Sequence, residues 1–149
     1  QWELALRMQA VPRTADYSAL SVWLQSQSRV EILKRLPPTV FWPRPKVDSA
    51  IVQILPDHER RNLIGDRQFF HEFMRRLFTQ RRKHLQGVLA TMYRDRMSRY
   101  EVEQCLGDFA LAPGTRAEEL PPGMLVAIGE RIRQVLELKA VDSSESVKE

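Results

Sequence analysis

Apolar residues alternate with polar ones in short segments of the first third of the chain. Good helix formers fill residues 2–10 and stop before Pro12, which predicts a helix. Residues 20–24 alternate apolar and polar side chains and predict a strand, and residues 30–33 predict a second one. Residues 47–54 predict a third strand. Because this segment is apolar on both faces near its end, we expect it to be central in a sheet or well covered.

After Pro56 the spacing becomes that of helices. Asp66 can cap a first helix, Ser98 and Glu101 form a capping box for a third, and a proline pair opens a fourth. The expected inward faces of the four helices comprise Phe69, Phe70, Phe73, Met74, Leu77 and Phe78; Leu85, Val88, Leu89 and Met92; Val102, Cys105, Leu106 and Phe109; and Leu125, Ile128, Ile132, Val135 and Leu136.

This order of elements predicts two unlike parts. Residues 1–56 offer three short strands and one helix, too little to bury a core, so we interpret them as the last strands of an α/β sheet that continues upstream. Residues 57–65 are expected to be a polar linker, and residues 66–140 an all-α C-terminal bundle. Residues 141–149 are small, polar and charged, and we expect a disordered tail.

Composition narrows the class of protein. With 43% hydrophobic and 28% charged residues, the 149-residue chain is typical of a soluble folded protein. No apolar run approaches the roughly 18–20 residues of a membrane helix. Cys105 is the only cysteine and phases with the apolar stripe, so we expect an inert thiol and a reducing, cytoplasmic location. The chain opens at Gln1 without a methionine, which we interpret as a processing or fragment boundary.

Positive charge is concentrated in one stretch. Between Arg75 and Arg99 there are eight basic residues and one acid, a charge of +7, while the rest of the chain carries −3 of the net +4. Such a segment favours a polyanionic partner, although a solvated helix face is the alternative. On a helical wheel Arg81 points inward, so we expect it to be structural and paired with a carboxylate. The expected phosphate contacts are Arg44, Lys46, Arg75, Arg76, Arg82, Lys83, Arg94, Arg96 and Arg99.

An aromatic pair lies on a loop stiffened by prolines. Phe41 and Trp42 precede Pro43, Arg44 and Pro45, and prolines hold their neighbours in extended conformations. An exposed aromatic ring beside cations can stack on an unpaired base while the cations meet phosphates. The competing interpretation is that both rings fill a hydrophobic gap under the loop, and physics alone favours it.

The same loop carries the strongest family resemblance. The string Phe41-Trp42-Pro43-Arg44-Pro45-Lys46-Val47-Asp48-Ser49-Ala50 resembles the Phe-x-Pro-x-Pro-Lys-Val-Asp-Ser-Ala motif of ribosomal RNA adenine dimethyltransferases. Further similar segments follow the family's order: Gln1-Trp2-Glu3, with Trp2 departing; Tyr17-Ser18-Ala19-Leu20-Ser21-Val22, with Ser18 and Ala19 departing; Gln80-Arg81-Arg82-Lys83; and Arg116-Ala117-Glu118-x-Leu120. The resemblance covers residues 1–139, and the combination favours the enzymes that modify the small ribosomal subunit.

The resemblance implies a Rossmann-like methyltransferase domain followed by a helical domain that docks on ribosomal RNA. Such enzymes transfer methyl groups from S-adenosylmethionine to N6 of two adjacent adenines in a small-subunit RNA hairpin. The resemblance places Phe41 against the target adenine. It places the cofactor loop and the catalytic Asn-x-Pro-aromatic segment upstream of Gln1, and the chain alone is expected to be inactive.

Three absences agree with that expectation. The six glycines are isolated, so no Gly-x-Gly loop is present, and the only asparagine, Asn62, is followed by Leu-Ile-Gly. The three histidines lack metal-ligand spacing, and we expect no metal. Two alternatives stay open: a non-enzymatic helical nucleic-acid-binding module, with residues 98–109 as a recognition helix, and a transcription-factor relative of the family. We expect a monomer.

Overall fold

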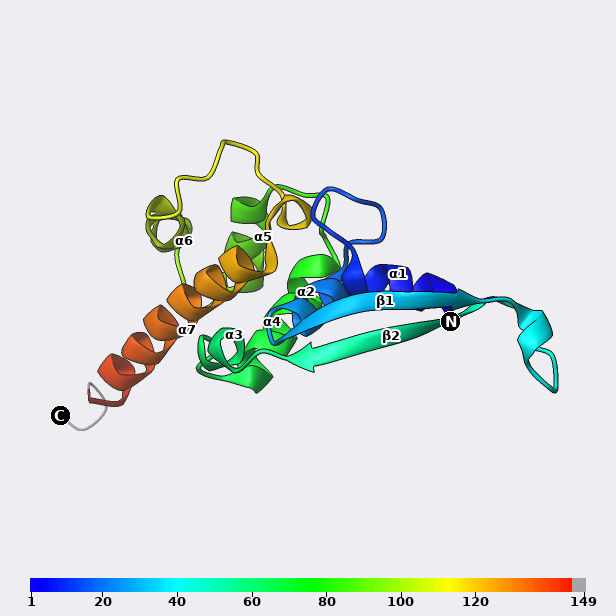
Figure 1. Ribbon diagram of the computed structural model, residues 1–149. Coiled ribbons are helices and arrows are strands. Elements are labelled where there is room, and N and C mark those ends of the chain that lie inside the picture. Colours follow the sequence, from blue (N-terminus) through cyan, green and yellow to red (C-terminus); the bar gives the residue numbers. More distant parts are fainter. Residues whose placement is uncertain (146–149) are drawn as a thin grey trace.

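The computed structural model describes residues 1–145, which form a two-stranded hairpin joined to a helical body (Figure 1). The strands are β1 (Ser28–Leu36) and β2 (Ser49–Pro56). The helices are α1 (Trp2–Gln9), α2 (Ala19–Gln25), α3 (His58–Asn62), α4 (Arg67–Phe78), α5 (Leu85–Met92), α6 (Arg99–Gly107) and α7 (Pro122–Glu145), with 3-10 segments η1 (Pro38–Val40) and η2 (Ala117–Glu119). This agrees with the expected mixed α/β and helical fold.

The hairpin is antiparallel and carries α1 on one face. Its register runs from Ser28 opposite Pro56 to Leu36 opposite Ser49, with an irregularity between Ile32 and Lys34. The Ile32 amide donates to Gln9 Oε1 at 2.8 Å, which ties α1 to the strand. The loop between the strands projects at one end of the molecule (Figure 1).

One hydrophobic core joins the helices to the N-terminal segment. Tyr17 and Val22 are fully buried in the same cluster as Phe70, Leu89 and Ile132. The core therefore crosses the predicted boundary at residue 56. The hairpin extends away from this core, and α1 and α2 connect the two, α2 by packing against both β1 and the helices α4 and α7.

The predicted helix starts are confirmed where the sequence names a cap. Asp66 Oδ1 accepts from the Phe69 amide at 2.9 Å. The Ser98 amide donates to Glu101 Oε2 at 2.7 Å, and the Glu101 amide donates to Ser98 Oγ at 3.2 Å. Each cap satisfies amides that a helix leaves free in its first turn. Glu101 also binds Lys139 Nζ at 2.7 Å, which joins α6 to α7 and lowers the Glu101 pKa to about 2.

The predicted strand at residues 20–24 is wrong, because these residues form α2. Ser18 and Ser21 make a capping box that starts the helix, and Ser21 Oγ donates to the Arg7 carbonyl at 2.5 Å. Val22 faces the core and Trp23 packs on Phe70. Neighbouring residues of this helix are therefore both covered, and the alternation of apolar and polar residues does not reflect a strand. Five residues are too few to separate the two periods.

Three further expectations need correction. Residues 57–65, expected to be a polar linker, are polar and mostly exposed, but they include the helix α3, capped by Asp57, and a buried Ile64. Residues 141–145 continue α7, and the rest of the predicted tail, 146–149, lies outside the described residues. The strand expected to be well covered is β2, yet Ile51, Ile54 and Leu55 are exposed, since no further strand covers it among residues 1–145.

We expect Tyr17→Phe to destabilise the fold by about 1–3 kcal/mol. The Tyr17 hydroxyl donates to the Leu120 carbonyl at 2.6 Å in a buried site, and the variant leaves that carbonyl without this donor. Urea unfolding measures the change. Tyr100→Phe is the control, because Tyr100 is 68% exposed and should give no change. Equal stability of Tyr17→Phe and the wild type would contradict this role.

Candidate functional site

The segment Gln80-Arg81-Arg82-Lys83 of the basic stretch lies in a turn and not in a helix. Helix α4 ends at Phe78, and α5 begins at Leu85. Between them the Gln80 amide donates to the Leu77 carbonyl at 3.2 Å, and the Lys83 amide donates to the Gln80 carbonyl at 2.9 Å. Consecutive side chains of this turn therefore point in different directions, which allows neighbouring arginines to have different roles.

Arg81 is directed into the protein. Its guanidinium donates to the Ala15 carbonyl at 3.1 Å and to the Tyr17 carbonyl at 2.5 Å. It also forms an ion pair with Glu118 at 3.5 Å, where the two side chains are 24% and 19% exposed. The expectation of a structural arginine paired with a carboxylate is confirmed.

Three segments of the chain meet around Arg81, and we call them the junction: residues 13–17, 80–85 and 115–120. The Arg13 amide donates to the Glu118 carbonyl at 2.8 Å, and the Leu85 amide donates to the Thr115 carbonyl at 2.8 Å. An isolated antiparallel bridge joins His84 to Arg116. The junction fixes the backbone of the turn from both sides.

Arg82 and Lys83 face solvent on the same turn. Both are exposed, and neither side chain has a hydrogen bond or ion pair within the part of the chain that the structure describes. Arg99, at the start of α6, is in the same situation. These three cations are available to an external anion, and their rigid surroundings limit the entropy lost on binding.

Other predicted phosphate contacts have partners inside the protein. Arg75 pairs with Glu72 at 3.0 Å, which holds the pKa of that carboxyl below its ordinary value. Arg76 donates to the Met92 carbonyl at 2.8 Å and lies over the Tyr93 ring at 5.6 Å. Arg96 reaches the Leu136 carbonyl at 3.4 Å, and Arg94 lies 3.9 Å from Asp95. For these four residues, phosphate binding stays a prediction.

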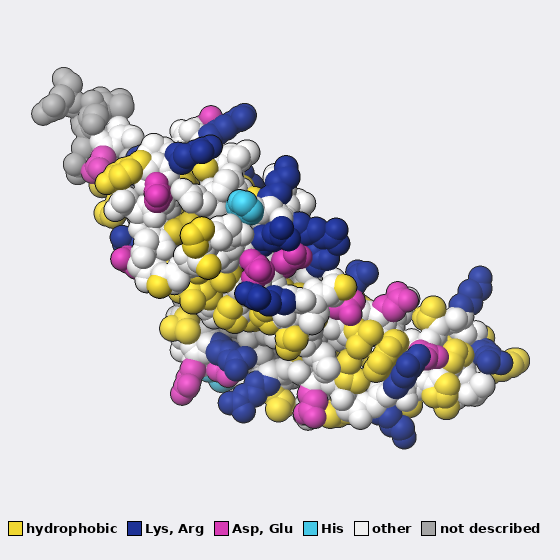
Figure 2. Space-filling model, turned by 90° about the horizontal axis from the view of Figure 1, so that it is seen from above, with side chains coloured by type: hydrophobic (Ala, Val, Ile, Leu, Met, Phe, Trp, Pro, Cys, Tyr) yellow, Lys and Arg dark blue, Asp and Glu magenta, His cyan; other side chains and the backbone are white. Residues whose placement is uncertain are grey.

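The loop between β1 and β2 forms a second cationic region. Arg44 and Lys46 are exposed, and the described residues offer neither side chain an ion pair. Phe41 is 39% exposed and Trp42 is 96% exposed. In the face that Figure 2 shows, Lys and Arg side chains lie over the helical part and again around the projecting loop. The two regions are at separate places on the molecule.

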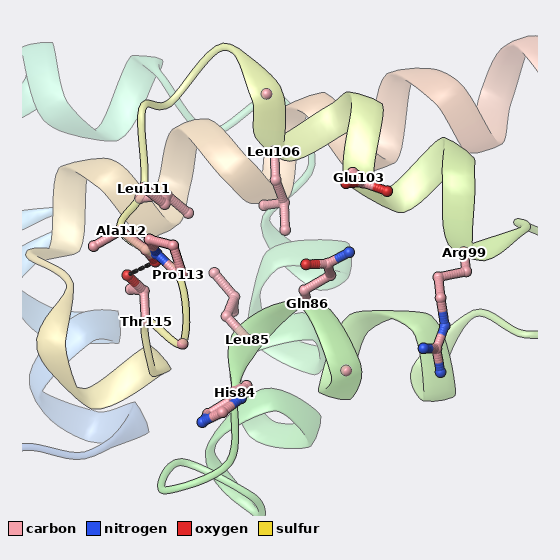
Figure 3. A pocket seen from close by; sticks show the side chains of 13 residues that line it. His84, Leu85, Gln86, Arg99, Glu103, Leu106, Leu111, Ala112, Pro113 and Thr115 are labelled. Carbon is pink, nitrogen blue, oxygen red and sulfur yellow. Dashed lines mark hydrogen bonds between the residues drawn. The ribbon is translucent and has the colours of Figure 1, made fainter.

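A cleft lies between the beginning of α5, helix α6 and the segment 111–115 (Figure 3). It has a volume of about 520 Å³, with Leu85, Leu106 and Leu111 among its walls. Arg99 and Glu103 lie at one side, and His84 at another. Of the predicted phosphate contacts, Arg99 alone lines this cleft. The cleft therefore borders the basic residues of the helical body, and no residue of the loop between β1 and β2 lines it.

The structure provides no metal centre among the residues it describes, because no three His, Cys, Asp or Glu side chains gather in a group that could hold an ion. Cys105 is buried, and burial raises the pKa of its thiol, so it stays protonated near neutral pH as expected for a core thiol. Within the described part, no helix is both long and apolar enough to cross a bilayer.

Comparison with known families decides what kind of chain this is. The family model described as "Ribosomal RNA adenine dimethylase" matches residues 1–131. The chain belongs to the ribosomal RNA adenine dimethylase family. The predicted family resemblance is confirmed.

Sequence relatives and solved structures agree with this membership. "Ribosomal RNA small subunit methyltransferase A" of Halothermothrix orenii is 39% identical over 120 residues, covering 80% of this chain and 40% of the relative. The protein of the same name from Nitratidesulfovibrio vulgaris (strain DP4) is 37% identical over 132 residues, covering 89% and 47%. The chain thus spans about half the length of the relatives or less.

Two solved structures share the fold. A dimethyladenosine transferase from Plasmodium falciparum superimposes with a TM-score of 0.79 at 19% identity, over 91% of this chain and 55% of that one. The 23S rRNA methyltransferase ErmE gives a TM-score of 0.50 at 23% identity, over 89% and 52%. The arrangement of hairpin and helical body in this chain therefore also occurs in solved structures.

Two arginines that border the turn at residues 80–84 were not among the phosphate contacts predicted from the sequence. Arg13 lies 3.8 Å from Glu119 and, with Arg82 and Glu118, lines a shallow hollow beside the junction. Arg116 is exposed and joins the turn through the His84 bridge. Neither belongs to the +7 stretch, and only their placement in the fold brings them to this surface.

The paired arginines of the turn give a matched test. We expect Arg81→Ala to lower the unfolding free energy by about 1–3 kcal/mol, because two carbonyls and Glu118 lose a charged donor. Arg82→Ala should change stability by less than about 0.5 kcal/mol, as for an exposed surface residue. Thermal and urea unfolding of the two variants measure the difference. Equal stabilities would show that the junction does not depend on Arg81.

Proposed function

We propose that this chain is the C-terminal part of an S-adenosylmethionine-dependent ribosomal RNA adenine N6-dimethyltransferase that acts on two adjacent adenines of small-subunit RNA. In this proposal the chain supplies docking on ribosomal RNA and one wall of the target-adenine pocket. The observation that carries it is the turn of this family member, in which Arg81 is engaged inside the protein while Arg82 and Lys83 are free.

Phosphate binding is the role that the free cations fit. Arg82, Lys83 and Arg99 lie on the helical body, and Arg44 and Lys46 lie on the loop. Contacts of lysine and arginine with phosphates orient a protein on its nucleic acid without reading sequence. Two separate cationic regions could hold two parts of one folded RNA, which would fix the position of the target loop between them.

The chemical step depends on placing the adenine. The exocyclic amine of adenine is conjugated with the ring and is a poor nucleophile, so rate enhancement comes mostly from holding the base in line with the methyl donor. Phe41 is partly exposed on a loop stiffened by prolines, where its ring can stack on a base taken out of its helix. This residue would position the substrate while other residues bind the cofactor.

We place cofactor binding and the catalytic segment in the part of the relatives that this chain does not span. The hairpin would then be the end of a Rossmann-like sheet, and Ile51 and Leu55 would be covered in the complete enzyme. A non-enzymatic helical module would not need the hairpin, so we favour the methyltransferase.

We further propose a cytoplasmic monomer. Calorimetry of this chain with S-adenosylmethionine tests whether cofactor binding lies outside it, and micromolar binding by the chain alone would contradict the proposal.

We expect the chain to bind small-subunit ribosomal RNA with a strong dependence on salt. Three to five phosphate contacts give a log–log slope of roughly −3 to −5 between affinity and salt concentration. Arg82→Ala with Lys83→Ala should make that slope shallower by about 2 units while the fold stays intact. Filter binding at several salt concentrations measures both. The control is Arg131→Ala, an exposed arginine on α7 outside the +7 stretch, which should leave the slope unchanged. A flat salt dependence would refute the docking role.

In the complete enzyme, Phe41→Ala should lower methylation by about 10- to 100-fold, because stacking contributes about 1–3 kcal/mol per base and 1.4 kcal/mol is a tenfold change. Phe41→Tyr should keep most activity, since the ring face survives. Val47→Ala, another exposed apolar residue beyond the loop's prolines, is the control. Methyl incorporation into small subunits measures activity. Normal methylation by Phe41→Ala, or early melting with lost RNA binding, would make Phe41 a packing residue.

A further inference from the structure

Trp42 is the most exposed large hydrophobic side chain among the described residues, with 96% of it open to solvent. The other two tryptophans both have partners. Trp2 lies under the Arg35 guanidinium at 4.7 Å, and Trp23 packs on Phe70 and His71 with ring centroids 6.1 and 4.9 Å away. Tryptophan is among the most buried residues on average, so a ring that the described residues leave almost fully exposed is open to a partner outside them.

The backbone of the loop around Trp42 is restrained on both sides of the aromatic residues. Prolines at positions 37 and 38 before the aromatic residues, and at positions 43 and 45 after them, fix backbone angles on both sides. The base of the loop is held by Arg35 Nε, which donates to Asp48 Oδ2 at 2.6 Å, and by the Trp2 amide, which donates to the Asp48 carbonyl at 2.9 Å. A loop backbone restrained in this way loses little freedom when the ring binds.

Phe41 and Trp42 are consecutive residues that both expose an aromatic ring, 39% and 96% open to solvent. The backbone of Phe41 is extended, with φ of −118° and ψ of 149°, and the chain bends through residues 41–43. The loop offers two separate stacking faces on neighbouring residues.

The charge of the loop selects RNA over an apolar protein surface as the occupant. Arg44 and Lys46 follow Trp42 directly, both exposed, while the nearest acid, Asp48, is engaged by Arg35. An apolar surface against Trp42 would desolvate these two cations without a counter-charge, which is costly. An unpaired nucleotide supplies a base for the ring and phosphates for the cations together.

We propose that Trp42 stacks on an unpaired base that neighbours the target adenine, so that the loop holds two unpaired nucleotides, one on Phe41 and one on Trp42. This rests on the proposed function and extends it: the substrate must present at least two unpaired bases in sequence. Trp42 is then a positioning residue that selects RNA loops over duplexes.

A hairpin RNA with 2-aminopurine in its loop, compared with a blunt duplex of equal length, tests the proposal on the complete enzyme. Trp42→Ala should weaken hairpin binding by about 5- to 100-fold, as expected for one lost stacking contact, and leave duplex binding unchanged. Trp42→Phe should restore most of the affinity. Binding should quench 2-aminopurine fluorescence in the wild type and not in Trp42→Ala. Leu33→Ala, on β1 and 54% exposed, is the matched control and should bind both RNAs normally.

Several results would overturn this inference. Wild-type hairpin affinity in Trp42→Ala, or an equal loss for hairpin and duplex, removes the stacking role. A Trp42 emission that is blue-shifted and shielded from acrylamide before RNA is added, taken as the difference from Trp42→Phe, would mean that protein covers the ring. If salt-dependent RNA binding persists in these cases, only the stacking fails. If the wild type binds neither RNA, the proposed function fails with it.

Discussion

The guanidinium group of Arg81 holds together three segments that lie far apart in the sequence. It binds the carbonyls of Ala15 and Tyr17 and the carboxylate of Glu118, and the buried Tyr17 hydroxyl adds a bond to the Leu120 carbonyl. A hydrogen bond to a charged donor is stronger than one between neutral groups, and here the donor is largely shielded from water. The N-terminal segment is thereby fixed to the helical body, and the direction of the hairpin follows from it.

The same junction sets how the neighbouring cations are presented. Because the turn at residues 80–84 is held from both sides, Arg82 and Lys83 are presented to solvent by a rigid backbone. The hairpin loop, which also carries free cations, lies at the far end of β1 and β2 (Figure 1). The proposed RNA would therefore contact two regions whose spacing is set by the fold, and a change at Arg81 would disturb both without touching RNA.

Much of the helical body could be predicted because its signals are local. Asp66, Ser98 and the apolar stripes give helix starts and inward faces directly. The strand predicted at residues 20–24 was wrong because alternation over five residues does not distinguish a strand from a helix buried on two sides. Arg81 was correctly expected to be structural, although it lies in a turn where a helical wheel does not apply. The internal partners of Arg76 and Arg96 are backbone carbonyls from other helices, which no sequence pattern reveals.

Chemical modification of arginines with phenylglyoxal, read by mass spectrometry with and without small-subunit ribosomal RNA, is the most direct test of this arrangement. Arg82 should react readily in the free protein and be protected when RNA is bound. Arg81 should resist modification in both states, because its guanidinium is engaged at the junction. Arg131, exposed on α7, should react equally in both. Modification of Arg81 as fast as Arg82, or an Arg82 that stays fully reactive in the RNA complex, would contradict the division of roles within the turn.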